Sequence, residues 1–469
     1  MGETLPSWKP SCNLSVSVQL SERKTSSDAG AFLLREVLDR SGVIESLDRQ
    51  LLDDRDPARV QHSLSSQLRT LLVQRALGWD DLSDTQTLAN DPVLQLACSD
   101  QRSTTPLEQP RPSQPTLSRL LNLLATDINQ SAFHDGLLDM AMWRLSSMRS
   151  GKPLSSITLD VDGLPIETFG QQVRTGYNSY VGYSHYSPLV ASIAETGDMV
   201  GGLLREGNSG CAVQAEYWIP KLVERIGKTT GTKVRVRFDA GFTGNPTLSA
   251  LDDANIEYVG RLSSNTVLER EAAHYLKRPV GRPTHQLREW CHEFYYQAQS
   301  WEKPRRIILV VCEQPDDLFL KHFFLVTSLD WKDWTPHKIL QLYRKRGKAE
   351  GHMGELKDTL NVHLSSTCRG ASTVQQVMGR NQVSLLLSLY AYQMLHSLRA
   401  LMERVTQKGW SIRKVREQIL KTAATVAVHA RKIAVHIGQS GGKWWPSPEE
   451  SPNDFDKNHK FKVDAHLVM

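Results

Sequence analysis

The sequence predicts an α/β protein with an all-helical amino-terminal module and a β-rich insertion in its α/β part. Between about residues 31 and 96, apolar residues recur at helical spacing. From residue 156 the pattern changes to the alternation of a strand, because Ile157, Leu159 and Val161 are separated by polar residues. The segment 263–334 is then rich in strand-forming and aromatic residues.

The chain is long enough for two to four domains of ordinary size. A Pro-, Ser- and Thr-rich segment at 103–115 breaks the helical pattern and predicts a linker. The expected organisation is a tail (1–29), a helical module (30–150), the first part of the core (151–262), the insertion (263–334), the second part of the core with carboxy-terminal helices (335–436) and a tail (437–469).

Composition narrows the function without establishing it. The net charge of +5 and the pI of about 8.8 permit nucleic-acid binding, and Lys and Arg outnumber Asp and Glu in segments 343–380 and 404–432. The six cysteines form no C-x-x-C pair, so a zinc ribbon or a disulfide framework is not indicated. The sequence has neither a signal peptide nor an apolar run of membrane-spanning length, which predicts a cytoplasmic protein that does not bind membranes.

A basic run contains the most informative spacing. Tyr343, Arg346, Glu350 and Lys357 follow at offsets of three, seven and fourteen, which would place them on one side of a continuous helix. A carboxylate flanked by phosphate-binding groups suits metal-assisted DNA cleavage. The alternative is an ordinary solvated helix face. Two further basic residues of the run, Arg344 and Lys348, are candidate DNA contacts.

Acidic residues in three other contexts complete a candidate metal site. Asp160 and Asp162 lie near the end of the predicted strand, and alternation puts both on the same face. Asp239 ends a second predicted strand, and Glu350 lies in the basic run. Each acid alone is more often a helix or turn cap than a ligand. Together they match the carboxylates that a two-metal phosphoryl-transfer site requires.

With these residues in place, the chain resembles the DDE transposases of bacterial insertion sequences, and specifically insertion-sequence family 1380. The spacing of Tyr343, Arg346, Glu350 and Lys357 matches the Tyr-x2-Arg-x3-Glu-x6-Lys signature of a larger related group. Ala240 stands where relatives commonly have Ser. The resemblance covers residues from about 30 to 435, and further matching motifs include Asp162-Gly163-Leu164-Pro165, Arg237-Phe238-Asp239-Ala240-Gly241-Phe242 and Tyr258-Val259-Gly260-Arg261-Leu262.

The resemblance implies an RNase H-like core whose catalytic and metal-binding triad is Asp162, Asp239 and Glu350, with Asp160 as the alternative first acid. Two Mg²⁺ ions, replaceable by Mn²⁺, would support strand cleavage at the element's ends and transfer of the resulting 3′-hydroxyl. The expected partners are double-stranded DNA, both terminal inverted repeats and target DNA, and a second copy of the chain in a synaptic complex. Cut-and-paste transposition would follow.

The resemblance also implies DNA-binding roles, with Tyr343, Arg346 and Lys357 holding DNA near the scissile phosphate. The helical module would recognise the inverted repeats, and Arg119 is a candidate contact there. Trp301, in the insertion, is a candidate for stacking on a flipped base. The alternative for Trp301 is a place in the core of the insertion.

Three other functions remain open at this point. An RNase H-like nuclease or a domesticated DNA-binding protein would share the fold without transposing. A carboxylate-dependent glycosidase would use two of the acids, but it leaves the Tyr, Arg and Lys spacing unexplained. A structural DNA-binding protein would need neither the metal nor Glu350.

Overall fold

The computed structural model describes residues 7–19, 22–148, 154–170, 172–179, 181–280, 285–315, 317–360, 362, 364–366, 372–430, 432–438 and 445. Most of the tail expected at 437–469 therefore lies outside the described residues. Within the described part of the chain, no helix combines the length and apolar character needed to cross a bilayer.

A mixed sheet of eight strands forms the centre of the molecule, in the order β12-β13-β14-β11-β10-β4-β8-β9. Strand β10 is parallel to both β4 and β11, and the other pairs in the sheet are antiparallel. This arrangement confirms the predicted mixed α/β class and is consistent with an RNase H-like core. The strands are β4 (Ser156–Gly163), β8 (Leu189–Ile193), β9 (Met199–Leu203), β10 (Lys233–Phe238), β11 (Glu257–Leu262), β12 (Arg288–Tyr296), β13 (Arg305–Glu313) and β14 (Lys321–Thr327).

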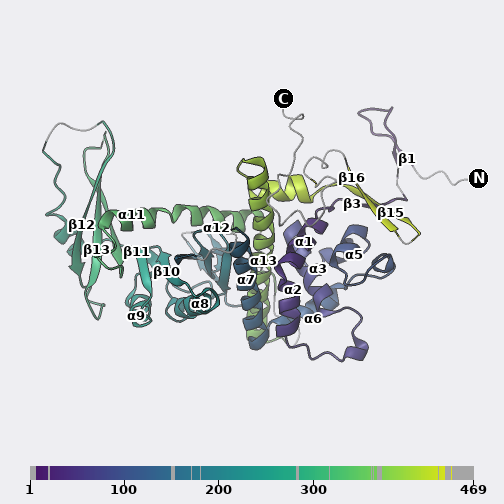
Figure 1. Cartoon of the computed structure of the whole chain (residues 1–469), viewed down its shortest axis with the longest axis horizontal. Helices are drawn as coiled ribbons and strands as arrows, with labels where there is room; N and C mark the ends of the chain where they lie inside the picture. Colours follow the sequence, from purple (N-terminus) through teal and green to yellow (C-terminus); the bar gives the residue numbers. More distant parts are fainter. Residues whose placement is uncertain are drawn as a thin grey trace, which may run out of the picture.

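Helices cover both faces of this sheet (Figure 1). On one face, α8 (Ala215–Thr230) and α9 (Asn245–Asp253) share a core with the inward side chains of β4 and β10. On the other, α11 (Pro336–Arg344) packs on β11, β13 and β14, and α12 (Gly347–Leu360) continues along the sheet. The short helix α10 (Thr266–Ala272) lies at the start of the segment 263–334.

The strands of the segment 263–334 extend the central sheet. Strand β14 pairs with β11 along four residues, so β12, β13 and β14 continue the core sheet at one edge. A smaller sheet of β5 (Ile166–Glu167), β7 (Tyr183–Tyr186) and β6 (Gly176–Asn178) lies between β4 and β8 in the sequence.

The amino-terminal helices share one hydrophobic core with the long helix α13 (Val374–Thr406). Figure 1 shows α13 between the first of these helices and the central sheet, and the last of them also contacts the sheet. The expected helical module is therefore built around a helix from the carboxy-terminal half. Its own helices are α1 (Ala31–Ser41), α2 (Val43–Gln50), α3 (Leu64–Leu77), α4 (Asp84–Thr87), α5 (Pro92–Cys98), α6 (Gln114–Leu124) and α7 (Asp127–Met148), with 3-10 turns at Pro57–Arg59 and Thr105–Leu107.

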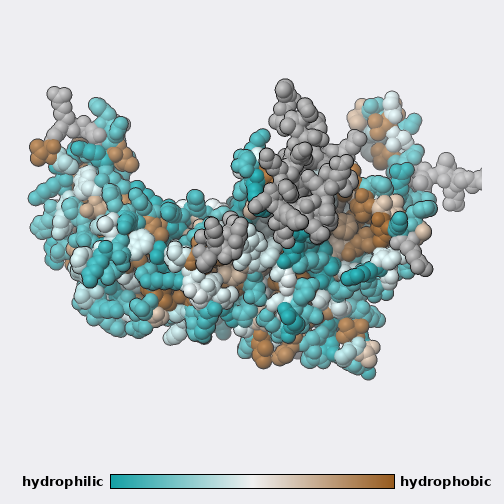
Figure 2. All heavy atoms as spheres, in the orientation of Figure 1, coloured by the Kyte–Doolittle hydropathy of each residue, from teal (hydrophilic) through white to brown (hydrophobic). Residues whose placement is uncertain are grey.

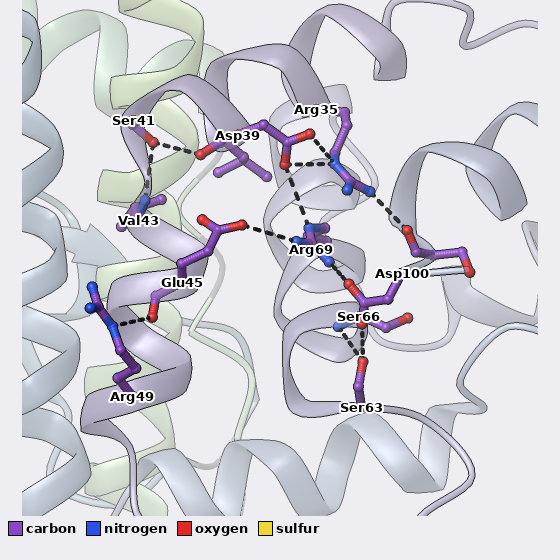
Figure 3. Close-up of polar contacts among 12 residues, drawn as sticks. Arg35, Asp39, Ser41, Val43, Glu45, Arg49, Ser63, Ser66, Arg69 and Asp100 are labelled. Atoms are coloured by element: carbon purple, nitrogen blue, oxygen red, sulfur yellow. Dashed lines mark hydrogen bonds and ion pairs between the residues drawn. The ribbon is translucent and has the colours of Figure 1, made fainter. Parts of the chain in front are cut away.

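A buried arginine joins the first helices of this module (Figure 3). Arg69 of α3 forms ion pairs with Asp39 of α1 at 4.0 Å and Glu45 of α2 at 3.6 Å, and it also pairs with Asp100. Arg35 binds the same Asp39 at 2.7 Å. Because Arg69 is buried and shared by three carboxylates, its charge stabilises the fold and is not presented to a ligand.

The two ends of the described chain meet in a third sheet. Strand β15 (Ala424–His429) pairs with both β16 (Lys432–Ile437) and β3 (Lys24–Ser26). The segment 335–436 was expected to end in helices. It has α14 (Ile412–Val415) and a π-helical turn (Arg416–Leu420), and a β-hairpin follows them. A small hairpin of β1 (Ser7–Trp8) and β2 (Val18–Gln19) precedes β3.

Candidate active site

The topology brings the two strand-end aspartates to one edge of the sheet. Asp162 lies near the end of β4, and Asp239 directly follows β10. The two strands are parallel, with Arg237 in register with Asp160, so their carboxyl ends meet at the same edge. Asp239 caps the turn that follows, because its Oδ1 accepts a hydrogen bond from the Gly241 N–H at 2.9 Å.

Arg346 connects this edge to Glu350 in the first turn of α12. Its Nη2 lies 2.6 Å from Asp162 Oδ2, and its Nη1 lies 2.5 Å from Glu350 Oε1. The Arg346 side chain is buried, whereas the Glu350 side chain is 61% exposed. One guanidinium therefore stands between two of the three predicted triad carboxylates.

The charges of the site influence one another. Burial raises the pKa of the Asp162 carboxyl to about 6, the Arg346 guanidinium opposes this shift, and the carboxylates of Asp239 and Glu350 add to it. Burial also raises the pKa of the Tyr343 hydroxyl, which senses Arg346, Asp239 and Glu350 as well. The three acids therefore lie within electrostatic reach of Tyr343 and Arg346.

Asp160 has a different environment, although it shares its strand face with Asp162. Its carboxylate is buried and receives Arg237 Nε at 2.5 Å and Nη2 at 2.6 Å, one on each oxygen. Arg237 also donates to the Leu342 carbonyl of α11 at 2.5 Å. Asp160 is thus neutralised inside the fold, and Asp162 is the aspartate of β4 that reaches the site.

The predicted continuous helix of the basic run is wrong. Helix α11 ends at Arg344 and α12 begins at Gly347, so Tyr343 and Glu350 belong to different helices and Arg346 lies in the turn between them. The turn is tightened because the Arg346 N–H donates to the Tyr343 carbonyl at 2.9 Å, three residues back. The two helices still follow one another closely enough to keep Tyr343, Arg346 and Glu350 together (Figure 1).

Lys357 and Tyr183 extend the site along α12. Lys357 Nζ donates to the Tyr183 hydroxyl at 3.0 Å and lies 5.6 Å from the centre of its ring. Tyr183 belongs to β7 of the small sheet. The sequence did not single out this tyrosine, because its partner lies far along the chain.

The remaining predicted DNA contacts lie farther from the acids. Arg344 forms an ion pair with Glu289 of β12, with one contact at 3.0 Å, so it fastens α11 to the sheet edge. Lys348 is exposed in the first turn of α12. Arg119 is exposed on α6, on the other side of α13 from the sheet (Figure 1).

The structure favours the core interpretation of Trp301. The residue is only 5% exposed and belongs to the core under the sheet. Its ring meets that of Tyr296 edge-on at 5.6 Å, and the Arg305 guanidinium lies 4.9 Å from its centre. The indole face is covered, so the prediction that Trp301 stacks on a DNA base is not supported by this geometry. Tyr295, by contrast, is 68% exposed.

A polar network connects α12 to the long helix α13. Glu355 of α12 pairs with Arg399 of α13, and its other oxygen accepts the Ile412 N–H at 3.1 Å. His352 Nδ1 lies 2.9 Å from the Tyr392 hydroxyl of α13. Sequence reasoning missed this network, although Tyr392, His396 and Arg399 follow one another at helical spacing on α13.

The acids have the chemistry of a divalent-metal site. Three carboxylates offer the oxygen ligands that Mg²⁺ and Mn²⁺ prefer, and their negative charge exceeds the single charge of Arg346. Among the described residues, no group of three or more His, Cys, Asp or Glu side chains is gathered closely enough to hold a metal ion. The guanidinium occupies the space between two of the acids instead.

Comparison with known proteins assigns the chain to a family. The profile of the family described as Transposase DDE domain group 1 matches residues 9–443. No curated protein matches the sequence. Among solved structures, the chain is similar to the piggyBac transposase in a cryo-EM structure of its synaptic complex with hairpin DNA, with 14% identity, a TM-score of 0.40 and coverage of 84% of this chain and 81% of that chain. Because the family match extends over most of its length, the protein belongs to the DDE transposases of domain group 1, a family of phosphoryl-transfer enzymes that act in DNA transposition.

Proposed function

We propose that this protein is the transposase of a bacterial insertion sequence of the kind represented by family 1380. It binds the terminal inverted repeats of its element, cuts DNA there and transfers the new 3′ ends to target DNA. The observation that carries this proposal is the meeting of Asp162, Asp239 and Glu350 around Arg346 in a chain of the DDE family. Membership of that family sets the glycosidase alternative aside.

Asp162, Asp239 and Glu350 are the proposed metal ligands and catalytic acids. Two Mg²⁺ ions, or Mn²⁺ in their place, would activate the attacking water or 3′-hydroxyl and stabilise the leaving oxygen. Burial is the main cause of the raised pKa of Asp162, and the carboxylates of Asp239 and Glu350 add to it, so a nearby cation would favour the ionised form. Asp160 has no such role in the proposal, since Arg237 occupies both of its oxygens.

The proposed DNA path crosses α11 and α12. Figure 2 shows that the molecule is hollowed above these helices, between the ends of the insertion strands and the upper end of α13, where the surface is mostly hydrophilic. Lys348 and Lys357 are exposed along α12. Tyr343, Arg346 and Lys357 position the phosphates there, independently of base sequence.

The proposed domain roles follow the chain order. The helices of residues 30–150, packed on α13, recognise the inverted repeats, with Arg119 as a candidate contact on α6. Residues 151–262 and 335–436 supply the catalytic core, and the strands of 263–334 extend its sheet. Because two element ends are processed together, a homodimer binds them in the synaptic complex.

The test is cleavage of linear duplex DNA that carries the sequences flanking the gene. The unaltered protein should cut within the flanks in Mg²⁺ but not in EDTA, and Glu350→Gln should abolish cutting. Glu224→Gln is the matched control, since it removes an exposed carboxylate that pairs with Lys228 on α8 and should leave cutting unchanged. Cutting at random positions would indicate a nuclease without transposition. DNA retention without metal-dependent cutting would indicate a DNA-binding protein.

A further inference from the structure

Each oxygen of the Asp162 carboxylate accepts one hydrogen bond from the protein itself. Its Oδ1 accepts the Gly163 N–H at 2.9 Å, and its Oδ2 receives Arg346 Nη2 at 2.6 Å. Glu350 Oε1 receives the other terminal nitrogen of the same guanidinium at 2.5 Å. Two of the three proposed metal ligands therefore share one arginine.

A buried arginine between carboxylates is an internal counter-ion. It offsets the repulsion among the acids, as the effect of Arg346 on the pKa of Asp162 shows. It also takes oxygen lone pairs that a cation needs, because a carboxylate oxygen bonded to a charged donor is a poorer ligand for a second positive charge. The arginine that stabilises the cluster of acids thus opposes the binding of a cation to them.

We propose that Arg346 competes with the divalent cations for Asp162 and Glu350, and that a DNA phosphate relieves this competition by drawing the guanidinium away. The inference rests on the proposed function, since it assumes that these acids bind the catalytic metal. Arg346 then couples the two events. Metal binding is weak in the DNA-free protein and strengthens when DNA is bound.

The position of Arg346 suits this exchange. It lies in the turn between α11 and α12, beside Gly347, whose surroundings are open. Its partner Glu350 is 61% exposed, so one of the two ion pairs of Arg346 is open to solvent. A guanidinium can bind a phosphate with two parallel hydrogen bonds, as it can bind a carboxylate. Arg346 would therefore replace its hydrogen bonds to carboxylate oxygens with hydrogen bonds to phosphate oxygens.

The coupling has a reciprocal consequence. If a bound duplex raises the affinity for Mn²⁺, then Mn²⁺ must raise the affinity for that duplex by the same factor. Replacing Arg346 with a neutral residue removes the competitor, so it should strengthen Mn²⁺ binding without DNA. A residue that merely orients the ligands would have the opposite effect when replaced.

The experiment measures free Mn²⁺ by electron paramagnetic resonance during titration of the full chain, with and without a duplex carrying the flanking sequence. Without DNA, Arg346→Gln should bind Mn²⁺ on the order of tenfold more tightly than the unaltered protein. The duplex should strengthen Mn²⁺ binding to the unaltered protein and have little effect on Arg346→Gln. In the titration without DNA, Lys348→Gln is the matched control, because it removes an exposed positive charge from the same helix turn.

The possible outcomes separate the two proposals. Weaker Mn²⁺ binding by Arg346→Gln, or equal strengthening by Arg346→Gln and Lys348→Gln, overturns the competition. Absence of Mn²⁺ binding by every variant, with or without DNA, overturns the proposed metal site itself. If Arg346→Gln does not fold by circular dichroism, Arg346→Lys carries the test. It keeps the charge but has one donor nitrogen in place of the two that hold Asp162 and Glu350, so it should bind Mn²⁺ more tightly than the unaltered protein, and equal or weaker binding contradicts the proposal.

Discussion

Two aspartates on the same face of β4 have opposite environments. Asp160 and its arginine, Arg237, form a closed pair in which both oxygens are bonded and the aspartate is 1% exposed. Asp162 is 23% exposed and shares Arg346 with Glu350, while Asp239 lies within electrostatic reach. The first cluster is balanced in charge, and the second has more carboxylates than cations.

The difference separates a structural ion pair from a site that can bind a cation. A buried carboxylate with one matched arginine has no capacity left for a ligand, and breaking the pair exposes an uncompensated charge. A cluster with surplus negative charge is destabilised as it stands, and an added cation relieves it. Proximity along a strand does not make two aspartates equivalent.

The largest expected effect is on catalysis. Asp162→Asn should reduce metal-dependent cleavage of the element ends by about 10⁴-fold, since it removes a proposed metal ligand, and leave the melting temperature within a few degrees. Cleavage rates and thermal melts measured side by side check this. Asp160→Asn is the matched variant and should instead lower the melting temperature. The reverse pattern would break the comparison.

The next effect is on stability. Arg237→Met should lower the free energy of unfolding by about 3 to 5 kcal/mol, because it leaves the Asp160 carboxylate buried without a partner. Urea denaturation followed by circular dichroism measures the change. The double variant Arg237→Met with Asp160→Leu should recover much of the loss. Equal destabilisation by the single and double variants would show that the charge itself is not the cause.

The pH dependence of metal binding should follow Asp162. Its pKa of about 6 in the folded chain means that protons compete with the cation below that pH, so Mn²⁺ affinity should fall about tenfold per pH unit there. The same shift affects folding stability. Between pH 3.8, the ordinary carboxyl pKa, and about pH 6, the folded state binds more protons than the unfolded state. Asp162 therefore lowers the free energy of unfolding as the pH rises through that window. Mn²⁺ titrations from pH 5 to 8 should show the inflection, and Asp162→Asn should lack it. The absence of an inflection in Mn²⁺ affinity between pH 5 and 8 would contradict a raised pKa of Asp162.

The smallest expected effect marks the outer limit of the site. Lys357→Gln should weaken DNA binding a few-fold and reduce the magnitude of the salt slope by about 1, as expected for one lost phosphate contact. Tyr183→Phe removes the hydroxyl that accepts from Lys357 but keeps the ring, so it should change affinity by less than about threefold. Fluorescence anisotropy across salt concentrations distinguishes the two. An unchanged salt slope in Lys357→Gln would leave Lys357 off the DNA path.

Local pattern predicted the elements of the core better than their connections. The alternation around Leu159 and Val161 correctly indicated β4, and the acids at strand ends meet as parallel strands require. The same pattern could not distinguish Asp160 from Asp162, because the decision depends on Arg237 of β10. It also could not show that β14 pairs with β11, since strand pairing depends on contacts distant in sequence.

Other features were missed for identifiable reasons. The spacing of Tyr343, Arg346 and Glu350 is compatible with one continuous helix. The break before Gly347 arises from one tight turn, in which the Arg346 N–H donates to the Tyr343 carbonyl. Strand β16 has the sequence Lys-Ile-Ala-Val-His-Ile, in which a large apolar residue stands at every second position, and its exposure alternates in the same way. This alternation is a sequence signal for a strand. Trp301 shows the limit of residue type as evidence, because an aromatic side chain suits a core as well as a base.

The shared core of α3 and α13 has a consequence for how the chain is made. When the ribosome has synthesised α3, the helix that completes its packing is still nearly three hundred residues away. At ordinary rates of translation the apolar faces of the first helices wait on the order of half a minute for α13. The nascent chain is therefore vulnerable to aggregation during this interval. An expression fragment that stops before α13 would carry the same exposed faces permanently, so a truncated transposase is expected to be captured by chaperones or degraded before it can compete for DNA.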